Sequence, residues 1–295
     1  MSAHRFAWAD AFADRAMAGN PCAVVFDADA VSRETRIALV RETGLSECAY
    51  LQASAVADFG VRYYTAKDEI RFAGHPTIAT CTVLEDAGLL AGRARFTLEV
   101  GSGVIPIEID RAGARPVFTM TQAAPVFGES FAPGAVAAIY GLEAADIVGR
   151  PQIVSTGTAF VVTLLTGHDA LRRAALDPAR LAGFMAGVDH PEAWKMEPFL
   201  VTRTGATSAG DTFARLLLPP PMPPEDPFTG SATGCMAAWL WHHGLIEAPR
   251  FTAEQGHWMG RPGQAAVEVL GPPEAIGGVR LGGTGVVLMR GEVAL

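Results

Sequence analysis

The sequence has few positive charges and no segment suited to a membrane. Its 295 residues carry 23 Lys and Arg against 31 Asp and Glu, a formal net charge of −8. This balance argues against a nucleic-acid partner, which needs a basic surface, and gives no support for binding an anionic membrane. The most apolar run, 160–165, is far too short to span a bilayer. Asp10 and Asp14 interrupt the N-terminus where a signal peptide would be apolar.

Cysteine is also scarce, and several cofactor motifs are missing. Cys22, Cys48, Cys81 and Cys235 are scattered, with no Cys-x-x-Cys pair and no paired histidine spacing. This usage predicts reduced, buried thiols in a cytoplasmic protein and no metal site. The chain contains no Gly-x-Gly-x-x-Gly, Gly-x-x-x-x-Gly-Lys or Gly-x-Ser-x-Gly motif. We therefore expect no nucleotide cofactor, and a serine hydrolase is weakly supported.

What the sequence does contain is an internal repeat. Gly74 to Gly88 encloses one apolar helical stretch, and Gly230 to Gly244 encloses another, 156 residues later. An Arg-Phe-Thr-x-Glu-x-Gly pattern follows each stretch, starting at Arg95 and at Arg250, 155 residues apart. Solenoid repeats are far shorter, about 20–50 residues. Chance similarity of two glycine-bounded helices is the alternative, but the nearly constant offset favours a duplicated domain.

Both repeated helices are apolar on nearly every side, which is typical of a helix buried all round. Because the rest of the chain reads mainly as short strands, sheet is the natural wrapping. We expect an α+β fold with two pseudo-symmetric domains, each a curled, barrel-like sheet around one central helix. The expected domains are 1–122, completed by the C-terminal strand at about 282–295, and 123–281. A chain of this length is comfortable for two such domains.

Local signals predict further elements. Ser32 caps a helix at 33–43, which Gly44 ends, and Leu45 to Leu51 reads as a strand. The remaining expectations are a short helix at 135–140, a helix at 169–184, a linker at 123–134, a stiff, extended proline-rich run at 219–224 and a final hairpin at 278–293.

The two central helices also predict a binding site. A helix N-terminus presents free backbone N–H groups and the positive end of its dipole, and so favours an anion. Pseudo-symmetric halves would bring the helix starts at Gly74 and Gly230 face to face across a cleft. Glycine allows close backbone approach there. A small carboxylate is the expected ligand.

Four polar residues are candidates for chemistry in this cleft. Glu47 lies in a strand-like segment and is either solvated or turned into the cleft, where burial raises a carboxyl pKa into the range of a general acid or base. His75, Asp226 and Ser231 stand at or near the two helix starts. Each also has a plain structural interpretation as a capping or turn residue.

These motifs resemble those of the PhzF (phenazine biosynthesis) family. The resemblance rests on Gly19-Asn20-Pro21, Leu45-Ser46-Glu47, Phe72 to Thr77, Glu225 to Ala232, Glu254-Gln255-Gly256 and Gly260-Arg261-Pro262. It implies a diaminopimelate-epimerase-like fold and a cofactor-independent isomerase that acts on a small carboxylate, usually as a homodimer. In the best-known member the substrate is a dihydro-hydroxyanthranilate.

The resemblance also implies residue roles. Glu47 matches the proton-transferring glutamate, with His75 and Asp226 as its catalytic companions. The expected substrate-binding residues are Gly74, Gly230, Ser231, Asn20 and Thr229.

Related racemases of this fold place a cysteine before each helix glycine, where this chain has Ala73 and Thr229. A carboxylate-centred proton shift therefore fits better than two-cysteine racemisation. A lyase or dehydratase that uses the same glutamate, and a binding protein without turnover, are the alternatives.

Overall fold

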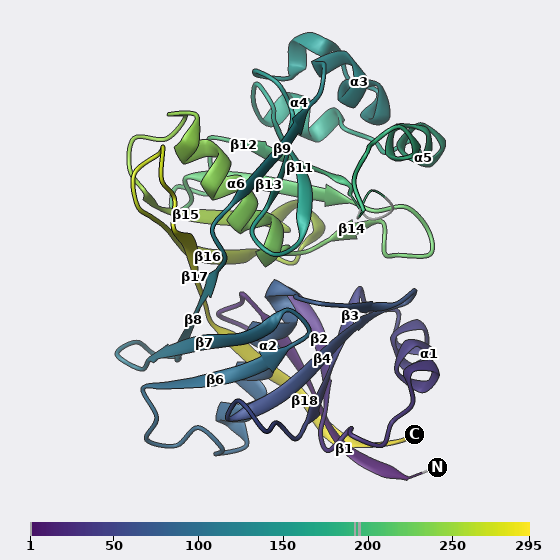
Figure 1. Ribbon diagram of the computed structural model, residues 1–295, viewed down its shortest axis with the longest axis vertical. Coiled ribbons are helices and arrows are strands. Elements are labelled where there is room, and N and C mark those ends of the chain that lie inside the picture. Colours follow the sequence, from purple (N-terminus) through teal and green to yellow (C-terminus); the bar gives the residue numbers. More distant parts are fainter. Residues whose placement is uncertain (1, 192, 194–195) are drawn as a thin grey trace.

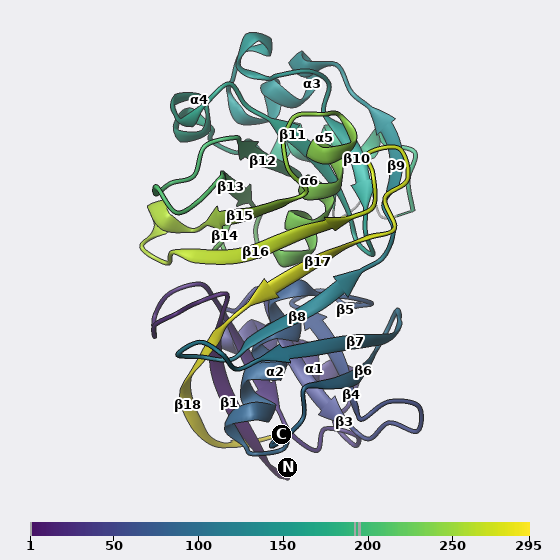
Figure 2. The same ribbon diagram turned by 90° about the vertical axis from the view of Figure 1, so that its left-hand side faces the viewer.

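The computed structural model describes residues 2–191, 193 and 196–295, which form two lobes stacked along the long axis of the molecule (Figures 1 and 2). Both chain ends lie on the first lobe, side by side (Figure 1). Its elements are β1 (Ala3–Ala11), β2 (Asn20–Val25), α1 (Arg33–Thr43), β3 (Glu47–Gln52), β4 (Phe59–Thr65), β5 (Glu69–Ile70), α2 (Gly74–Asp86), β6 (Arg95–Val100), β7 (Gly103–Asp110), β8 (Val117–Gln122) and β18 (Gly285–Ala294).

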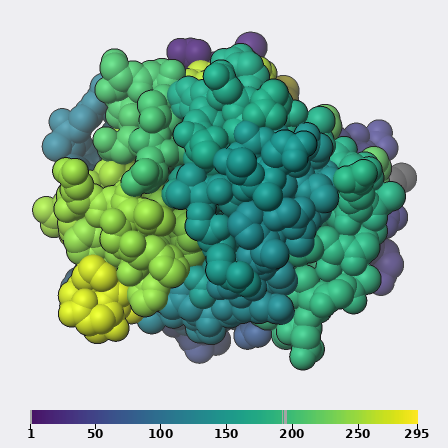
Figure 3. Space-filling model, turned by 90° about the horizontal axis from the view of Figure 1, so that it is seen from above, coloured from purple at the N-terminus to yellow at the C-terminus, as the bar shows by residue number. Residues whose placement is uncertain are grey.

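The second lobe holds the middle of the chain. Its elements are β9 (Val126–Ser130), α3 (Pro133–Ala137), β10 (Gln152–Ser155), β11 (Ala159–Leu164), α4 (His168–Arg173), α5 (Pro178–Ala186), β12 (Pro198–Thr202), β13 (Thr212–Leu217), β14 (Glu225–Asp226), α6 (Gly230–His242), β15 (Arg250–Gln255), β16 (Gly263–Leu270) and β17 (Gly278–Gly283), with short 3-10 turns at Ala138–Tyr140, Ala144–Asp146 and His257–Met259. Seen from above, the far end of this lobe is covered by the segment that carries α3, α4 and α5 (Figure 3).

The strand pairings repeat from one lobe to the other. In the first lobe β1–β2 is antiparallel, β2–β3 parallel, β3–β4 antiparallel, β4–β6 parallel, and β6–β7–β8 antiparallel. The second lobe has the same sequence of pairings through β10, β11, β12, β13, β15, β16 and β17. The sheet order thus agrees with the internal repeat.

The two halves meet at a symmetric ladder. β8 and β17 are counterparts at an offset of 161 residues, and they pair antiparallel with each other. Met120 pairs with Leu281, its own counterpart, so the pseudo-twofold axis passes between these two residues. Within the part of the chain that the structure describes, one continuous 18-stranded sheet therefore runs through both lobes.

After this ladder, the next strand of each half pairs with a strand of the other half. β9 follows β8 but pairs with β10 in the second lobe, and β18 follows β17 but pairs with β1 in the first. The hairpin expected at 278–293 is therefore wrong, because β17 and β18 have different partners. The linker expected at 123–134 is also wrong in part, because β9 occupies 126–130. The domain boundaries stay a prediction.

Local signals predicted some elements well and others poorly. α1 has the expected bounds, with Ser32 Oγ accepting from the Thr35 N–H and Gly44 in the left-handed conformation. The helix expected at 169–184 is two helices, because Asp177 caps a new one that starts at Pro178. The proline-rich run is not extended: it turns back as the loop between β13 and β14, closed by the Leu218 N–H to Pro224 carbonyl bond of 3.1 Å.

Candidate active site

The N-termini of the two central helices touch. A Cβ placed on Gly74 would lie 2.6 Å from the backbone nitrogen of Ser231 and 2.7 Å from Cα of Gly230. A Cβ on Gly230 would lie 3.2 Å from Cα of Gly74. Backbone cannot give way as a flexible side chain can, so glycine at 74 is a condition of this contact. The two helix starts, 156 residues apart in sequence, form one junction.

This junction concentrates hydrogen-bond donors. N–H groups of a helix's first turn have no acceptor within their own helix. α2 supplies those of Gly74 and His75, since Pro76 has none, and α6 supplies those of Gly230, Ser231 and Ala232. Both dipoles present their positive ends to the same place. An anion is the ligand that this arrangement favours.

Matching side chains hold the two helix starts. The Thr77 hydroxyl donates to the Ala73 carbonyl at 2.6 Å, and its counterpart Thr233 donates to the Thr229 carbonyl at 2.9 Å. Tyr63 Oη lies 2.8 Å from Thr77 Oγ1 and ties α2 to β4. The first turns are fixed in equivalent ways, as expected for a duplicated structure.

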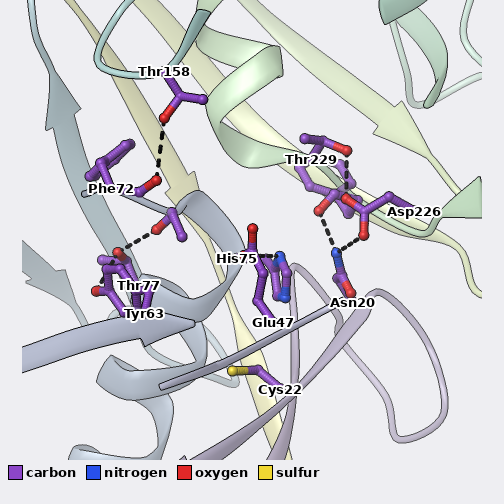
Figure 4. Close-up of polar contacts among 12 residues, drawn as sticks. Asn20, Cys22, Glu47, Tyr63, Phe72, His75, Thr77, Thr158, Asp226 and Thr229 are labelled. Carbon is purple, nitrogen blue, oxygen red and sulfur yellow. Dashed lines mark hydrogen bonds and ion pairs between the residues drawn. The ribbon is translucent and has the colours of Figure 1, made fainter. Parts of the chain in front are cut away.

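Glu47 is the first residue of β3 and lies next to His75. Its Oε2 is 3.5 Å from Nδ1 of His75, across the start of α2 (Figure 4). This is long for a hydrogen bond, although such contacts in ligand-free sites often shorten on binding. The Glu47 side chain is 20% exposed and that of His75 only 4%. The Glu47 carboxylate is thus accessible to a ligand, while the His75 ring lies buried beside it.

Burial keeps His75 neutral. Desolvation lowers its pKa from 6.5 to about 3. A neutral ring carries one proton, and the neighbouring carboxylate favours that proton on Nδ1. Nε2 is buried and, among the described residues, has no hydrogen-bond partner. Nδ1 of His75 is thus able to donate toward Glu47, and the ring holds no second proton at neutral pH.

Asp226, at the end of β14, is a buried acid of the second lobe. Asn20 Nδ2 donates to its Oδ1 at 2.8 Å, and Thr229 Oγ1 donates to its Oδ2 at 2.6 Å. The Asn20 bond joins residues 206 positions apart and ties the lobes together (Figure 4). Desolvation raises the pKa of Asp226 to about 6, against the hydrogen bonds from Thr229, Asn20 and Ser46 that lower it. Asp226 is therefore mostly ionised at pH 7.

A cavity of about 110 Å³ lies between the lobes at this point. Its polar lining includes four predicted site residues, Glu47, Asp226, Thr229 and Ser231. His75, Asn20, Gly74 and Gly230 do not line it but contact the residues that do. Sequence reasoning missed the remaining walls, which come from both lobes: Ser46, Thr65, Lys67, Ile70, Phe72, Thr158, Phe160, Glu197, Leu216, Leu218 and Met222. The cavity is smaller than typical ligand pockets, which measure about 300–1,000 Å³, and so suits only a small molecule.

A larger hollow of about 540 Å³ opens elsewhere between the lobes, lined by Phe12, Arg15, Glu254 and His257 among others. None of the predicted site residues lines it. Its buried carboxylate, Glu254, is occupied by the Thr207 hydroxyl at 2.5 Å and the Thr207 N–H at 2.9 Å. The smaller cavity, where the acids and the helix starts meet, is therefore the candidate active site.

Two buried glutamines support the start of α6. Gln255 bonds the turn from Asp226 to Thr229, and Gln122 Nε2 donates to the Gly230 carbonyl at 2.9 Å. Gln255 belongs to the Glu254-Gln255-Gly256 motif, so the sequence carried a signal for it. Gln122 is the last residue of β8, and no motif in the sequence indicated it.

Among the described residues, no group of His, Cys, Asp and Glu could hold a metal ion, and no helix is long and apolar enough to cross a membrane.

Comparison with known proteins gives consistent matches over the whole chain. The model of the phenazine biosynthesis-like protein family, PhzC-PhzF, matches residues 9–291. The trans-2,3-dihydro-3-hydroxyanthranilate isomerase of Pseudomonas aeruginosa is 28% identical over 295 residues, 99% of this chain and 100% of that protein. The uncharacterized isomerase YfhB of Bacillus subtilis is 28% identical over 283 residues, 95% of this chain and 94% of that protein.

A solved structure confirms the fold class. The PhzF-family phenazine biosynthesis protein of Bacillus anthracis superimposes with a TM-score of 0.87 at 25% identity, covering 100% of both chains. A hydroxyproline epimerase from Agrobacterium vitis shares this fold, with a TM-score of 0.65 at 14% identity over 99% of this chain and 91% of that one. The prediction of an α+β, epimerase-like fold and the predicted resemblance are both confirmed. The chain belongs to the phenazine biosynthesis-like family, PhzC-PhzF, and is an isomerase-like enzyme of that family.

Proposed function

We propose that this protein is a cofactor-independent isomerase that moves a proton between carbon atoms of a small carboxylate, with Glu47 as the acid and base. One observation carries this proposal. Glu47 faces a small cavity beside the junction of two helix N-termini, and a neutral histidine lies behind it. A base and an anion site are thus side by side.

The reaction would conserve all atoms of the substrate. Glu47 removes a proton from an acidic C–H bond, and the electron pair of that bond delocalises into the adjoining unsaturated system. The backbone N–H groups at Gly74, Gly230 and Ser231 bind the carboxylate and stabilise the added negative charge. Glu47 then returns the proton to a different carbon. The product is an isomer of equal mass.

His75 and Asp226 would assist without exchanging protons with the substrate. His75 stays neutral well below physiological pH, so it would orient Glu47 through Nδ1. Asp226 already accepts two hydrogen bonds and lines the cavity, so it would accept a further one from a substrate hydroxyl or ammonium group. Asn20 and Thr229 would hold that carboxylate in place.

Deuterium incorporation tests this assignment. The wild type is incubated in D₂O with a panel of small carboxylates, among them trans-2,3-dihydro-3-hydroxyanthranilate, the compound in the name of the Pseudomonas relative. We expect incorporation or isomerisation with the wild type and at least a 100-fold slower rate with Glu47→Gln. Glu292→Gln, an exposed position on β18, is the matched control. Equal exchange in Glu47→Gln would remove Glu47 from the central role.

The same experiment separates isomerisation from elimination. A lyase or dehydratase would lose water and change the product mass, whereas an isomerase leaves it unchanged apart from deuterium. If compounds of the panel bind but none exchanges a proton or is converted, none of them is the substrate, and a different substrate would be required.

We also propose a cytoplasmic homodimer. The four cysteines are buried thiols, which suits a reducing compartment, and the dimer is implied by the family resemblance. Sedimentation at micromolar concentration would give twice the 31.0 kDa chain mass, and a monomer would reject the dimer.

A further inference from the structure

Gln255 has a hydrogen-bonding arrangement that fixes more than a turn. It is 1% exposed at the end of β15. Its Oε1 accepts from the Thr229 N–H at 3.0 Å. Its Nε2 donates to the Asp226 carbonyl at 2.7 Å and to Thr229 Oγ1 at 3.2 Å. Every donor and acceptor of the carboxamide group is thus directed at the Asp226–Thr229 turn.

These partners determine which way the amide points. A backbone N–H can only donate, so the atom that faces the Thr229 N–H must be the oxygen. A backbone carbonyl can only accept, so the atom that faces the Asp226 carbonyl must be the nitrogen. The second hydrogen of Nε2 is then available for Thr229 Oγ1, and that hydroxyl oxygen becomes an acceptor.

The orientation of the Gln255 amide also determines which hydrogen bonds the Asp226 side chain accepts. A hydroxyl has a single hydrogen, and with its oxygen already accepting from Gln255, that hydrogen is directed at Asp226 Oδ2, 2.6 Å away. Asn20 works in the same way on the other oxygen. Its Nδ2 donates to the Phe228 carbonyl at 2.8 Å and to Asp226 Oδ1 at 2.8 Å. Both carboxyl oxygens are therefore acceptors.

We infer that Gln255 is a positioning residue, which acts through the Thr229 hydroxyl to hold Asp226 as a hydrogen-bond acceptor toward the cavity. This rests on the proposed function only in taking that cavity as the active site. A substrate group at Asp226 would then have to be a donor, a hydroxyl or an ammonium. Chains of hydrogen bonds in a buried site polarise one another, so losing the first donor weakens the second bond.

Other charges near Asp226 are kept constant by the choice of variants. Glu225 precedes it and is paired with Arg215 at 2.7 Å, while Glu47, Lys67 and Glu197 line the same cavity. Neutral substitutions at 255 and 229 leave all of these in place. A change in the titration of the Asp226 carboxyl group would then be due to the lost hydrogen bonds.

The test is a ¹³C NMR titration of protein labelled at the aspartate carboxyl carbons, with the Asp226 resonance assigned by its loss in Asp226→Asn. Thr229→Val removes the hydroxyl donor, and we expect about a tenfold change in the acid constant, which raises the protonated fraction at pH 7 from about one tenth to about half. Gln255→Leu should raise that fraction as well, by no more than Thr229→Val does. In the Thr229→Val background, Gln255→Leu should add nothing, because the chain is already broken.

Two controls and two contrary outcomes make the titration decisive. Gln122→Leu removes the other buried glutamine beside α6 and should leave the Asp226 titration unchanged, while Thr229→Ser should preserve it. No change in Gln255→Leu, or an equal change with and without the Thr229 hydroxyl, would overturn the inference. The titration needs no substrate, so its result is independent of whether the proposed isomerisation is found.

Discussion

At the scale of single residues, the site contains two buried groups whose pKa values move in opposite senses. The pKa of His75 is lowered from 6.5 to about 3, so the unfolded chain binds more protons than the folded chain between these pH values, and acid destabilises the fold. The pKa of Asp226 is raised from 3.8 to about 6, so the folded chain binds more protons between these pH values, and rising pH destabilises the fold over that range. Each contributes a slope of about 1.4 kcal/mol per pH unit. Between pH 3.8 and 6 the two slopes cancel.

Removing one group should expose the slope of the other. We expect His75→Asn to lose stability as pH rises from 4 to 6, by about 1.4 kcal/mol per unit relative to the wild type. Asp226→Asn should show the reverse, with stability that falls more steeply than the wild type on acidification over the same range. Urea unfolding at a series of pH values measures both. Parallel curves for the three proteins would contradict the opposed shifts.

At the scale of elements, the glycine contact between α2 and α6 sets the geometry of the proposed anion site. The Cβ of an alanine at 74 would press on backbone atoms of Gly230 and Ser231. The Cβ of an alanine at 230 would meet the ring of Phe12 at 3.0 Å, a contact that a side chain can relieve more easily than backbone can. The two positions are therefore equivalent in the repeat but not in tolerance.

Alanine substitutions measure this difference. We expect Gly74→Ala to destabilise the protein by about 1–3 kcal/mol and to weaken binding of a small carboxylate, because the helix starts must separate. Gly230→Ala should cost less. Gly183, inside α5 with nothing within 4 Å of its added Cβ, is the control, and Gly183→Ala should stabilise by about 0.5–1 kcal/mol. Urea unfolding and calorimetric titration with a carboxylate report the two effects. Unchanged stability and binding in Gly74→Ala would contradict the tight junction.

The success of the sequence interpretation depended on how local each signal was. α1 could be placed to the residue because Ser32 and Gly44 act on their own helix. The partners of β17 and β18 could not, since a strand's hydrophobic pattern does not name its neighbour. In the same way, the candidate acids could be picked by type and motif, but not the bond of Asn20 to Asp226 or the direction given by Gln255.

At the scale of the whole molecule, the exchange of β9 and β18 makes each lobe depend on a distant piece of chain. β1 lies between β2 and β18, and α2 packs against β1, β2 and β18. The first lobe therefore closes only with the last residues in place. The continuous sheet through β8 and β17 then couples both lobes.

Deleting 285–295 should therefore damage the beginning of the chain. We expect amides of β1 and α2 to lose protection from hydrogen exchange, because β1 becomes an unpaired edge and α2 loses one wall. A synthetic peptide of residues 285–295, added in excess, should restore protection, while a scrambled peptide should not. Retained protection of α2 in the truncated protein would show that the first lobe closes without β18.

The neighbouring chain ends carry one more consequence. The Ser2 N–H donates to the Leu295 carbonyl at 2.7 Å and the Leu295 N–H donates back to the Ser2 carbonyl at 2.9 Å. By the repeat, this gap between β18 and β1 corresponds to the connection from β9 to β10, which carries α3. The polypeptide is thus nearly circular. The connection from β9 to β10 and the gap from β18 to β1 are equivalent positions, and the chain is interrupted only at the second. A circular permutant that links 295 to 2 and opens between 131 and 151 would present the two halves in reverse order and keep the same sheet.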